Sequence, residues 1–379
     1  MYVLLSILVV FISIWIRKHP TVLLNIPVIG FIPYMLLFDK NMYFDLTAWQ
    51  KDEFRTWIRD NDVIVAAGAK TGTTMLLYIS HLIRVRGDTD SYPFREVNVA
   101  TPWPSIMHSP GQTWEQMKVL MNSTVLNDGK LLKQYWDHPQ YPFRIFKSHE
   151  TPVIYEHNDG DYEDLHIETN VLDVRAFPRV KFVAMTRDLP DALASFYPFP
   201  ANHDDEFVKL WGGFPPAFIS VDHLLHTFLY MNKLSKLHHV FCGYTLSWWK
   251  VHQDPNVLFL HYNEAINDRR AFIVKLAKFY NQELTDKEVT KIYDLSSIEA
   301  MRKIGYQFNY QLWGNKKFRN GTGTCMKSGK LLRKGIVGDS KIVFTESQLR
   351  VLRDFEDNFY GKSEDGVAAK IFSRHGTIR

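Results

Sequence analysis

Residues 70–74, with the sequence Lys-Thr-Gly-Thr-Thr, combine a cation, three hydroxyl groups and a glycine. They follow a short apolar run at residues 63–67 and precede an amphipathic run at residues 75–84. A strand, a loop and a helix in this order aim backbone N–H groups and a helix N-terminus at a phosphate. The lysine and the hydroxyls add further donors, and Gly72 lets the backbone approach an anion closely. An ordinary turn with a surface lysine is the alternative interpretation.

Lys147, Ser148 and His149 form a second group, which ends an apolar run that starts at Phe143. Ligands of open α/β sheets lie at the carboxyl ends of the strands, so this run would deliver Lys147 and His149 to such a site. A histidine accepts a proton near neutral pH and can act as a general base. A single histidine is more often structural, so the catalytic interpretation depends on the neighbouring motifs.

Two further segments are suited to a second phosphate. A strand-like run ends at Arg187, and Ser195 follows about two helical turns later, so both could bind one phosphate if the loop folds back. Arg333, Lys334 and Gly335 begin a loop in which basic residues alternate with glycines. A capped helix with a solvated arginine and a flexible basic surface loop are the alternatives.

These four loops, in this order, resemble those of the sulfotransferases of the cytosolic type that use PAPS (3′-phosphoadenosine 5′-phosphosulfate). The Lys-Ser-Gly-Thr-Thr-Trp loop of that family appears as residues 70–75, its Lys-Thr-His as residues 147–149, and its Arg-(seven residues)-Ser site as Arg187 and Ser195. Its Tyr-Glu-Asp appears as residues 262–264, its adenine segment loosely as residues 296–301, and its Arg-Lys-Gly loop as residues 333–341. The resemblance covers the chain from about Asp62 to the C-terminal helix.

The resemblance implies an enzyme that transfers a sulfuryl group from PAPS to a hydroxyl or an amine. His149 would take the acceptor proton, Lys70 would stabilise charge on the leaving phosphate, and Lys147 would assist. The residues implied to bind PAPS are Lys70, Thr71, Gly72, Thr73, Thr74, Met75, Arg187, Ser195, Tyr262, Ser296, Ile298, Met301, Arg333, Lys334 and Gly335. Within that set, Thr73 and Thr74 would hold the 5′-phosphate. The 3′-phosphate would be held by Arg187, Ser195, Arg333, Lys334 and Gly335.

The chain departs from the family pattern at several positions. Met75 stands where the family has a tryptophan against the adenine, although methionine still offers a soft apolar contact. The dimer motif of the family is degraded in residues 341–350, which puts the familiar homodimer in doubt. The separation of Lys70 from Lys147 is larger than usual, so we expect an insertion within residues 88–140 that alters acceptor specificity.

Alternating elements must position these loops. Four short, apolar, β-branched runs are expected to be buried parallel strands, at residues 63–67, 143–147, 180–186 and 257–261. Helices are expected at residues 73–84, 189–196, 222–237, 244–252, 266–280 and 345–360. This alternation predicts an α/β fold with a central parallel sheet that is flanked by helices on both faces. Thr285 and Glu288 have the spacing of a capping box.

Composition excludes few functions. The formal net charge of +4 suits an anionic ligand, but the chain has no dense basic patch or known motif that would favour nucleic acid. Its two cysteines, Cys242 and Cys325, exclude a disulfide framework but not a single bridge. No carboxylates or histidines are spaced as metal ligands, so we expect no metal.

Residues 3–16 form an uncharged apolar run that is followed by the basic pair Arg17-Lys18. The run is shorter than the roughly 20 residues that span a bilayer as a helix. A cleaved signal peptide is disfavoured, because no basic segment precedes the run and no signal-peptidase-like site follows it. We expect a membrane segment at residues 1–18, a linker with a second apolar stretch at 19–51, and the sulfotransferase domain at 52–379. The basic pair favours a cytosolic catalytic domain. A Golgi lumenal orientation, a signal peptide and an N-terminal helix packed on the domain stay open.

The acceptor is the least determined part of the prediction. A small apolar or aromatic acceptor would suit an aromatic wall, although aromatic residues also fill cores; the candidates are Trp103, Phe196, Tyr197 and Trp211. Residues 88–140 and 198–216 are candidate lids or pocket walls. The main alternative function is a membrane-tethered relative that binds nucleotide without catalysis, which predicts a missing lysine or histidine. A nucleotide kinase would need a Gly-Lys-Thr loop and an aspartate that holds Mg²⁺.

Overall fold

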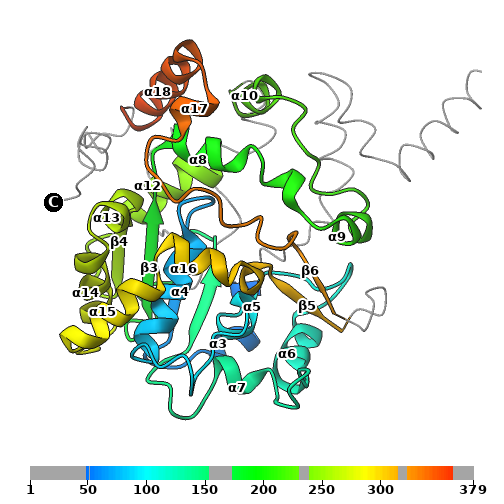
Figure 1. Ribbon diagram of the computed structural model, residues 1–379, viewed down its shortest axis with the longest axis vertical. Helices are drawn as coiled ribbons and strands as arrows, with labels where there is room; N and C mark the ends of the chain where they lie inside the picture. Colours follow the sequence, from blue (N-terminus) through cyan, green and yellow to red (C-terminus); the bar gives the residue numbers. More distant parts are fainter. Residues whose placement is uncertain (1–47, 51, 153–172, 230–238, 315–321, 362–379) are drawn as a thin grey trace, which may run out of the picture.

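The computed structural model describes residues 48–50, 52–152, 173–229, 239–314 and 322–361. At its centre lies a sheet of four parallel strands in the order β2-β1-β3-β4. The strands are β1 (Val63–Ala67), β2 (Ile145–Ser148), β3 (Lys181–Thr186) and β4 (Val257–His261). Helices cover the sheet on both faces (Figure 1), which confirms the predicted α/β fold.

The connections of the sheet create a topological switch point. The chain passes from β1 to β2 on one side and then returns to place β3 on the other side of β1. Val63 of β1 therefore pairs with Ile145 in β2 and with Lys181 in β3. The strand order reverses between β1 and β3, which is where open α/β sheets bind ligands, beyond the carboxyl ends of the strands.

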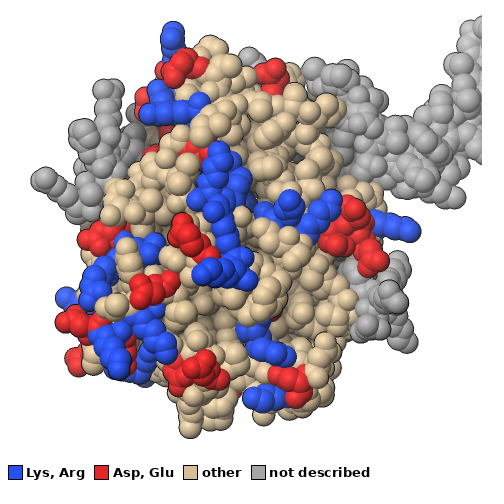
Figure 2. Space-filling model, in the orientation of Figure 1, with Lys and Arg blue, Asp and Glu red and all other residues tan. Residues whose placement is uncertain are grey.

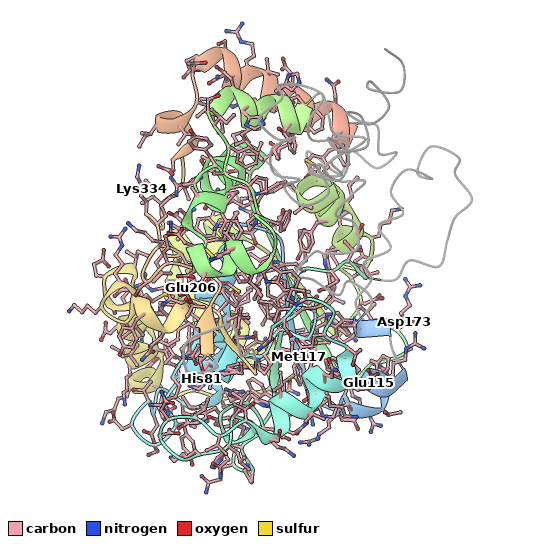
Figure 3. The ribbon with its side chains drawn as sticks, turned by 90° about the vertical axis from the view of Figure 1, so that its right-hand side faces the viewer. His81, Glu115, Met117, Asp173, Glu206 and Lys334 are labelled. Carbon is pink, nitrogen blue, oxygen red and sulfur yellow. The ribbon has the colours of Figure 1, made fainter. Side chains whose placement is uncertain are left out.

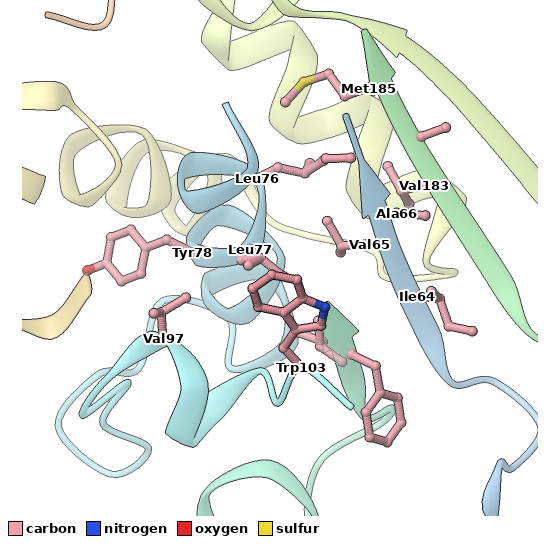
Figure 4. Packing of buried hydrophobic residues seen from close by; sticks show 14 of the residues in the cluster. Ile64, Val65, Ala66, Leu76, Leu77, Tyr78, Val97, Trp103, Val183 and Met185 are labelled. Atoms are coloured by element: carbon pink, nitrogen blue, oxygen red, sulfur yellow. The ribbon is translucent and has the colours of Figure 1, made fainter. Parts of the chain in front are cut away.

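The sheet is buried because helices pack on each face. All five residues of β1 are 0% exposed, which explains a continuous apolar run instead of an alternating one. Helix α4 (Thr73–Arg84) covers one face, where Leu76 and Leu77 lie against Val65 of β1 (Figure 4). Neighbouring strand residues point to opposite faces, and Phe182 of β3 meets Trp248 of α12 (Tyr244–Lys250) on the second face, at 6.2 Å between ring centroids.

The remaining elements surround this core. Residues 88–140, predicted to hold an insertion, contain α5 (Val97–Ala100), α6 (Trp114–Ser123) and α7 (Lys133–Trp136). The longer helices elsewhere are α8 (Leu189–Phe196), α9 (Asp205–Leu210), α10 (Val221–Leu229), α14 (Arg269–Phe279), α15 (Asp286–Leu295) and α18 (Glu346–Gly361). Shorter pieces are α3 (Asp52–Trp57), α13 (Tyr262–Asn267), α16 (Ile298–Lys303), α17 (Ser340–Val343), and the antiparallel pair β5 (Gln311–Trp313) and β6 (Thr322–Thr324).

Several predicted boundaries need correction. The helix expected over residues 266–280 is two helices, because Asp268 ends α13 and its carboxylate accepts a hydrogen bond from the Ala271 N–H at 2.9 Å to cap α14. Strand β2 begins at Ile145 instead of residue 143. The predicted capping box of α15 is confirmed, because Thr285 and Glu288 exchange both hydrogen bonds. The helix expected over residues 222–237 is α10 in its first part, and its remainder lies outside the described residues.

The predicted membrane segment at residues 1–18 and nearly all of the linker at 19–51 lie outside the described residues. Within the part of the chain that is described, no helix is both long enough and apolar enough to cross a membrane. Cys242 and Cys325 are both free and buried, so the single bridge that the sequence left open is not formed.

Candidate active site

The four parallel strands end at one edge of the sheet, and a predicted site residue follows each of them. Lys70 follows β1, His149 follows β2, Arg187 follows β3 and Tyr262 follows β4. Arg187 and Lys70 are in contact at the switch point, where Nη1 of Arg187 lies 3.4 Å from the carbonyl oxygen of Lys70. The fold therefore gathers residues from four distant parts of the sequence at one place.

The loop between β1 and α4 is a tight turn with two left-handed residues, Lys70 (φ 61°) and Gly72 (φ 95°). A Cβ atom at position 72 would lie 2.8 Å from a ring carbon of Tyr262, so both the backbone and the close approach require glycine. The hydroxyls of Thr71 and Thr73 donate to the carbonyl oxygen of Gly68 at 2.8 and 3.3 Å. These bonds fix the turn from which α4 starts, as a phosphate-binding loop requires.

Lys70 is a half-buried residue at the switch point. Its Nζ lies 4.2 Å from the centroid of the Phe199 ring, a cation–π arrangement. Burial lowers the pKa of Lys70 to about 7, and the positive charges of Arg333 and Arg187 add to the effect. Each of these causes disfavours the protonated form of Lys70, and a bound anion would favour it.

His149 is held so that one ring nitrogen is available as a base. Its Nδ1 lies 2.6 Å from the carbonyl oxygen of Ala67. A carbonyl only accepts hydrogen bonds, so Nδ1 carries the proton and Nε2 carries the lone pair. Burial lowers the pKa of His149 well below its usual range, and Lys147 and Lys70 lower it further. The imidazole is therefore neutral at pH 7, which is the form that accepts a proton.

Lys147 lies next to His149 and is almost completely buried, at 3% exposed. Its Nζ lies 3.4 Å from the centroid of the Trp103 ring and 4.0 Å from that of Tyr310, so two aromatic faces enclose the ammonium. Burial lowers the pKa of Lys147 well below its usual value. The ring of Trp103 also meets the imidazole of His149 edge to face, at 5.1 Å between centroids.

Arg187 is 8% exposed, and a carboxylate orients it. Its Nη2 lies 3.3 Å from Oδ2 of Asp191 and donates to the carbonyl oxygen of Ile336 at 2.9 Å, and its guanidinium carbon lies 4.3 Å from the centroid of the Tyr262 ring. Burial alone would raise the pKa of Asp191, but the N–H of Ser340 and the charge of Arg187 bring it below its usual value. Ser195 lies near the end of α8, the helix that begins two residues after Arg187.

Residues 333–340 cross the carboxyl edge of the sheet and carry the other basic residues. Lys and Arg side chains gather over this loop on the face shown in Figure 2, and Lys334 lies at its outer surface (Figure 3). Arg333 and Lys334 both pair with the buried Asp339, the latter at 2.8 Å. Gly335 has a φ of 67°, and a Cβ there would lie 3.2 Å from the Ile298 side chain.

The residues predicted to contact an adenine lie in different surroundings. Ile298 lies against Gly335 in the basic loop. Ser296 and Met301 are each 1% exposed, and the Ser296 hydroxyl lies 3.4 Å from the carbonyl oxygen of Tyr293. Met75 is partly buried against the core. Ile298 is therefore the member of this set that the structure joins to the phosphate-suited loops.

Sequence reasoning missed three buried carboxylates that organise the site. Asp191 accepts from the backbone N–H groups of Gly338 and Ser340 at 2.7 and 2.9 Å, and so ties the basic loop to α8. Asp339 neutralises the basic pair, and Glu150 accepts from the backbone of His149. Only Asp191 had a signal in the sequence, since it follows Pro190 in the first turn of a helix.

The predicted aromatic wall is only partly in place. Trp103 lies beside His149. Trp211 is instead 3% exposed and packs on Phe207, at 6.2 Å between ring centroids. The ring of Phe196 stacks on that of Phe199, and Nζ of Lys70 lies over the Phe199 ring. Phe199 and Tyr310, which sequence reasoning did not select, lie against Lys70 and Lys147, at 4.2 and 4.0 Å from Nζ to the ring centroid.

The arrangement combines a neutral histidine with three basic side chains, those of Lys70, Lys147 and Arg187, at one edge of the sheet. Such a site can bind a group with two anionic ends and remove a proton from a molecule placed near His149. Among the described residues, no group of three or more His, Cys, Asp and Glu side chains could hold a metal ion.

Comparison with protein families and curated proteins agrees with this geometry. The family model described as a sulfotransferase domain matches residues 60–363. A 3-beta-hydroxysteroid sulfotransferase of Cavia porcellus is 24% identical over 357 residues, which cover 92% of this chain and 95% of that protein. An amine sulfotransferase of Oryctolagus cuniculus is 28% identical over 170 residues, which cover 45% of this chain and 51% of the relative.

Solved structures share the fold. A mouse sulfotransferase, SULT7A1, complexed with PAP matches with a TM-score of 0.52 at 17% identity, over 87% of this chain and 92% of its own. A retinol dehydratase in a complex with retinol and PAP matches with a TM-score of 0.54 at 17% identity, over 84% of this chain and 85% of its own.

Proposed function

The chain belongs to the sulfotransferase family, and we propose that it transfers a sulfuryl group from PAPS to a hydroxyl or amine of a small, apolar or aromatic acceptor. The observation that carries this proposal is the tautomer of His149. Its Nδ1 is occupied by the Ala67 carbonyl, which leaves the Nε2 lone pair for an acceptor proton, beside the ammonium groups of Lys147 and Lys70.

The residues present fit a nucleotide with two anionic groups. Gly72 and Gly335 have positive φ values, and a Cβ at Gly72 would collide with the Tyr262 ring. The glycines leave the backbone free to approach a ligand closely at both loops. Arg187 is a buried arginine whose Nε has no hydrogen-bond partner, a donor that a phosphate oxygen would satisfy. Bound PAPS would supply the sulfuryl group.

Each residue has a proposed task. His149 would accept the acceptor proton at Nε2, and Lys70 would neutralise charge that develops on the leaving phosphate. Lys147, held between two rings, would keep a positive charge beside the transferred group. Arg187 and the basic loop at residues 333–335 would hold the 3′-phosphate. The N–H groups at Thr73 and Thr74 begin a helix and would face the 5′-phosphate.

An acceptor screen tests the function. Protein lacking residues 1–38 would be incubated with labelled PAPS and a panel of a 3β-hydroxysteroid, retinol, 4-nitrophenol and an alkylamine. We expect a labelled sulfate ester or sulfamate from at least one of them. Calorimetric binding of PAP without transfer to any panel member would contradict the small-acceptor proposal and favour a relative that only binds nucleotide.

Replacement of Arg187 tests the 3′-phosphate site. We expect Arg187→Ala to weaken binding of PAP far more than binding of AMP, which lacks the 3′-phosphate. A charge-assisted hydrogen bond contributes roughly 1.5–3 kcal/mol, which corresponds to a loss of about 10- to 150-fold. Calorimetry with both nucleotides measures the difference, and Arg175→Ala, at an exposed arginine paired with Asp254, is the control. Equal losses of affinity for PAP and AMP would show that Arg187 does not bind the 3′-phosphate.

We further propose that residues 1–16 hold the full-length protein to membranes, with the catalytic domain, expected at residues 52–379, on the cytosolic side. The apolar run is costly to expose to water, and the Arg17-Lys18 pair follows the positive-inside rule. Carbonate extraction and protease protection of microsomes would test the two parts. Release by carbonate would contradict the anchor. A protected domain, or glycan on Asn122 in the Asn-Ser-Thr acceptor sequence at residues 122–124, would place the domain in the Golgi lumen.

A further inference from the structure

Glu150 directly follows His149 and has no task in the proposed mechanism, yet it is a buried carboxylate. It is 2% exposed and lies between Ser105 and Ser148, which are each 0% exposed. The Ser105 hydroxyl donates to Oε1 and the Ser148 hydroxyl donates to Oε2. The backbone N–H of His149 also donates to Oε2, at 2.8 Å.

These contacts all place hydrogen-bond donors on the carboxylate of Glu150. The backbone N–H of Glu150 donates to the Ser148 hydroxyl oxygen at 3.0 Å, so the single hydroxyl proton of Ser148 is free to point at the carboxylate. Three donors thus converge on its two oxygens. A buried carboxylate is stable only with such donors around it.

Glu150 connects the elements that frame His149. Ser105 belongs to the same short loop as Trp103, whose ring lies 5.1 Å from the imidazole of His149 and 3.4 Å from Nζ of Lys147. On the other side, Nε1 of Trp248 in α12 donates to the carbonyl oxygen of Glu150 at 3.2 Å. One side chain and its backbone therefore join the end of β2 to the Trp103 loop and to α12.

We propose that Glu150 is a positioning residue for the reaction: its carboxylate ties Ser105 to Ser148, fixes Trp103 against His149, and keeps a negative charge beside the ammonium of Lys147. The inference rests on the proposed function of His149 and Lys147. It adds a residue whose own side chain contacts neither nucleotide nor acceptor in that mechanism.

The charge of Glu150 has a measurable effect because Lys147 is buried. Burial lowers the pKa of Lys147, and Lys70 lowers it further. Cys325, Glu150 and Glu96 oppose this shift, and the neighbouring His149 is neutral. Removing the negative charge of Glu150 would leave the ammonium less stable, so Lys147 would lose its proton at a lower pH.

The test compares Glu150→Gln with a matched control, Glu288→Gln. The carboxylate of Glu288 also accepts from a backbone N–H and a hydroxyl, both of Thr285, at 2.7 and 2.8 Å, but it lies in the capping box of α15. Lysines labelled with ¹³C at Cε would be titrated by NMR in the ligand-free protein, with the Lys147 signal assigned by its loss in Lys147→Arg. The turnover of the best acceptor in the panel above would be measured with labelled PAPS.

In Glu150→Gln we expect the titration midpoint of Lys147 to fall by about one pH unit and kcat to fall about tenfold or more, with PAP affinity unchanged within about twofold. Glu288→Gln should change neither quantity. An unchanged midpoint in Glu150→Gln would overturn the inference. If Glu150→Gln does not fold, Ser105→Ala is the second variant: it keeps the charge and removes one donor, so kcat should fall several-fold while the midpoint stays, and an unchanged kcat would overturn the inference.

His149→Ala separates this inference from the proposed function. A fully active His149→Ala would remove the base on which the inference rests. An inactive His149→Ala beside a Glu150→Gln that behaves like wild type would overturn the Glu150 inference alone.

Discussion

His149→Ala is expected to reduce transfer by about 10²–10⁴-fold, the usual contribution of a general base, while PAP still binds. The replaced ring holds its Nε2 lone pair toward the site because its Nδ1 lies 2.6 Å from the Ala67 carbonyl. The phosphate-suited residues Lys70 and Arg187 are unchanged, so calorimetry should give the wild-type affinity for PAP. Rapid-quench measurement of a single turnover reports the chemical step.

The pH profile of the wild-type enzyme tests the same assignment. Burial, Lys147 and Lys70 lower the pKa of His149 well below its usual range, so the base is neutral over the physiological range. The contribution of His149 to activity should therefore be lost when the pH drops through that lowered pKa. His252→Ala, at another histidine whose Nδ1 contacts a backbone carbonyl, should leave turnover unchanged. More than a tenth of wild-type turnover in His149→Ala, with chemistry shown to limit the rate, would remove His149 from this role.

Lys70→Met is expected to lower kcat by about 10²–10³-fold, as for the loss of one group that stabilises developing charge. Methionine keeps the apolar stem over the Phe199 ring but removes the ammonium, which lies 4.2 Å from that ring centroid. Lys287→Met, at an exposed lysine on α15, is the control. A kcat within threefold of wild type would contradict the proposed role.

Lys70 also makes PAP binding depend on pH. Its pKa in the free site is lowered to about 7 by burial and by Arg333 and Arg187, and a phosphate beside it would raise that pKa. Binding above pH 7 therefore takes up a proton, and the affinity should fall by up to about tenfold per pH unit as the pH rises from 7. In Lys70→Met this slope should be absent, and calorimetry in buffers of different ionisation enthalpy would detect the missing proton.

Local patterns were enough to predict the elements nearest the phosphate loop. Strand β1 and helix α4 have the predicted bounds. An apolar run, a glycine and a stretch of helical spacing follow one another here, and no local signal favours a different structure. The split at Asp268 was missed although its signal is local, since aspartate is a good N-cap. The helical spacing of apolar residues continues past Asp268, so a single helix was predicted there.

The carboxylates of the site could not be predicted because their partners are distant in sequence. Ser105 reaches Glu150 from 45 residues away, and Asp191 bonds Ser340 across 149 residues. A lone Glu after a histidine, or an Asp in the first turn of a helix, is normally solvated. These carboxylates are buried beside their donors only because β2 pairs with β1 and because the basic loop packs over α8.

The basic loop that crosses the sheet edge has a consequence for how the protein matures. Synthesis runs from the N-terminus, so Lys70, His149 and Arg187 emerge long before residues 333–340 can join them. If residues 333–335 hold the 3′-phosphate as proposed above, an incomplete chain would bind PAP more weakly than the finished domain, which PAP at a free concentration 100 times Kd would stabilise by about 2.7 kcal/mol. On the same proposal, a chain that ends before Arg333 would keep the four strands of the sheet but gain less resistance to proteolysis from PAP than the full-length chain.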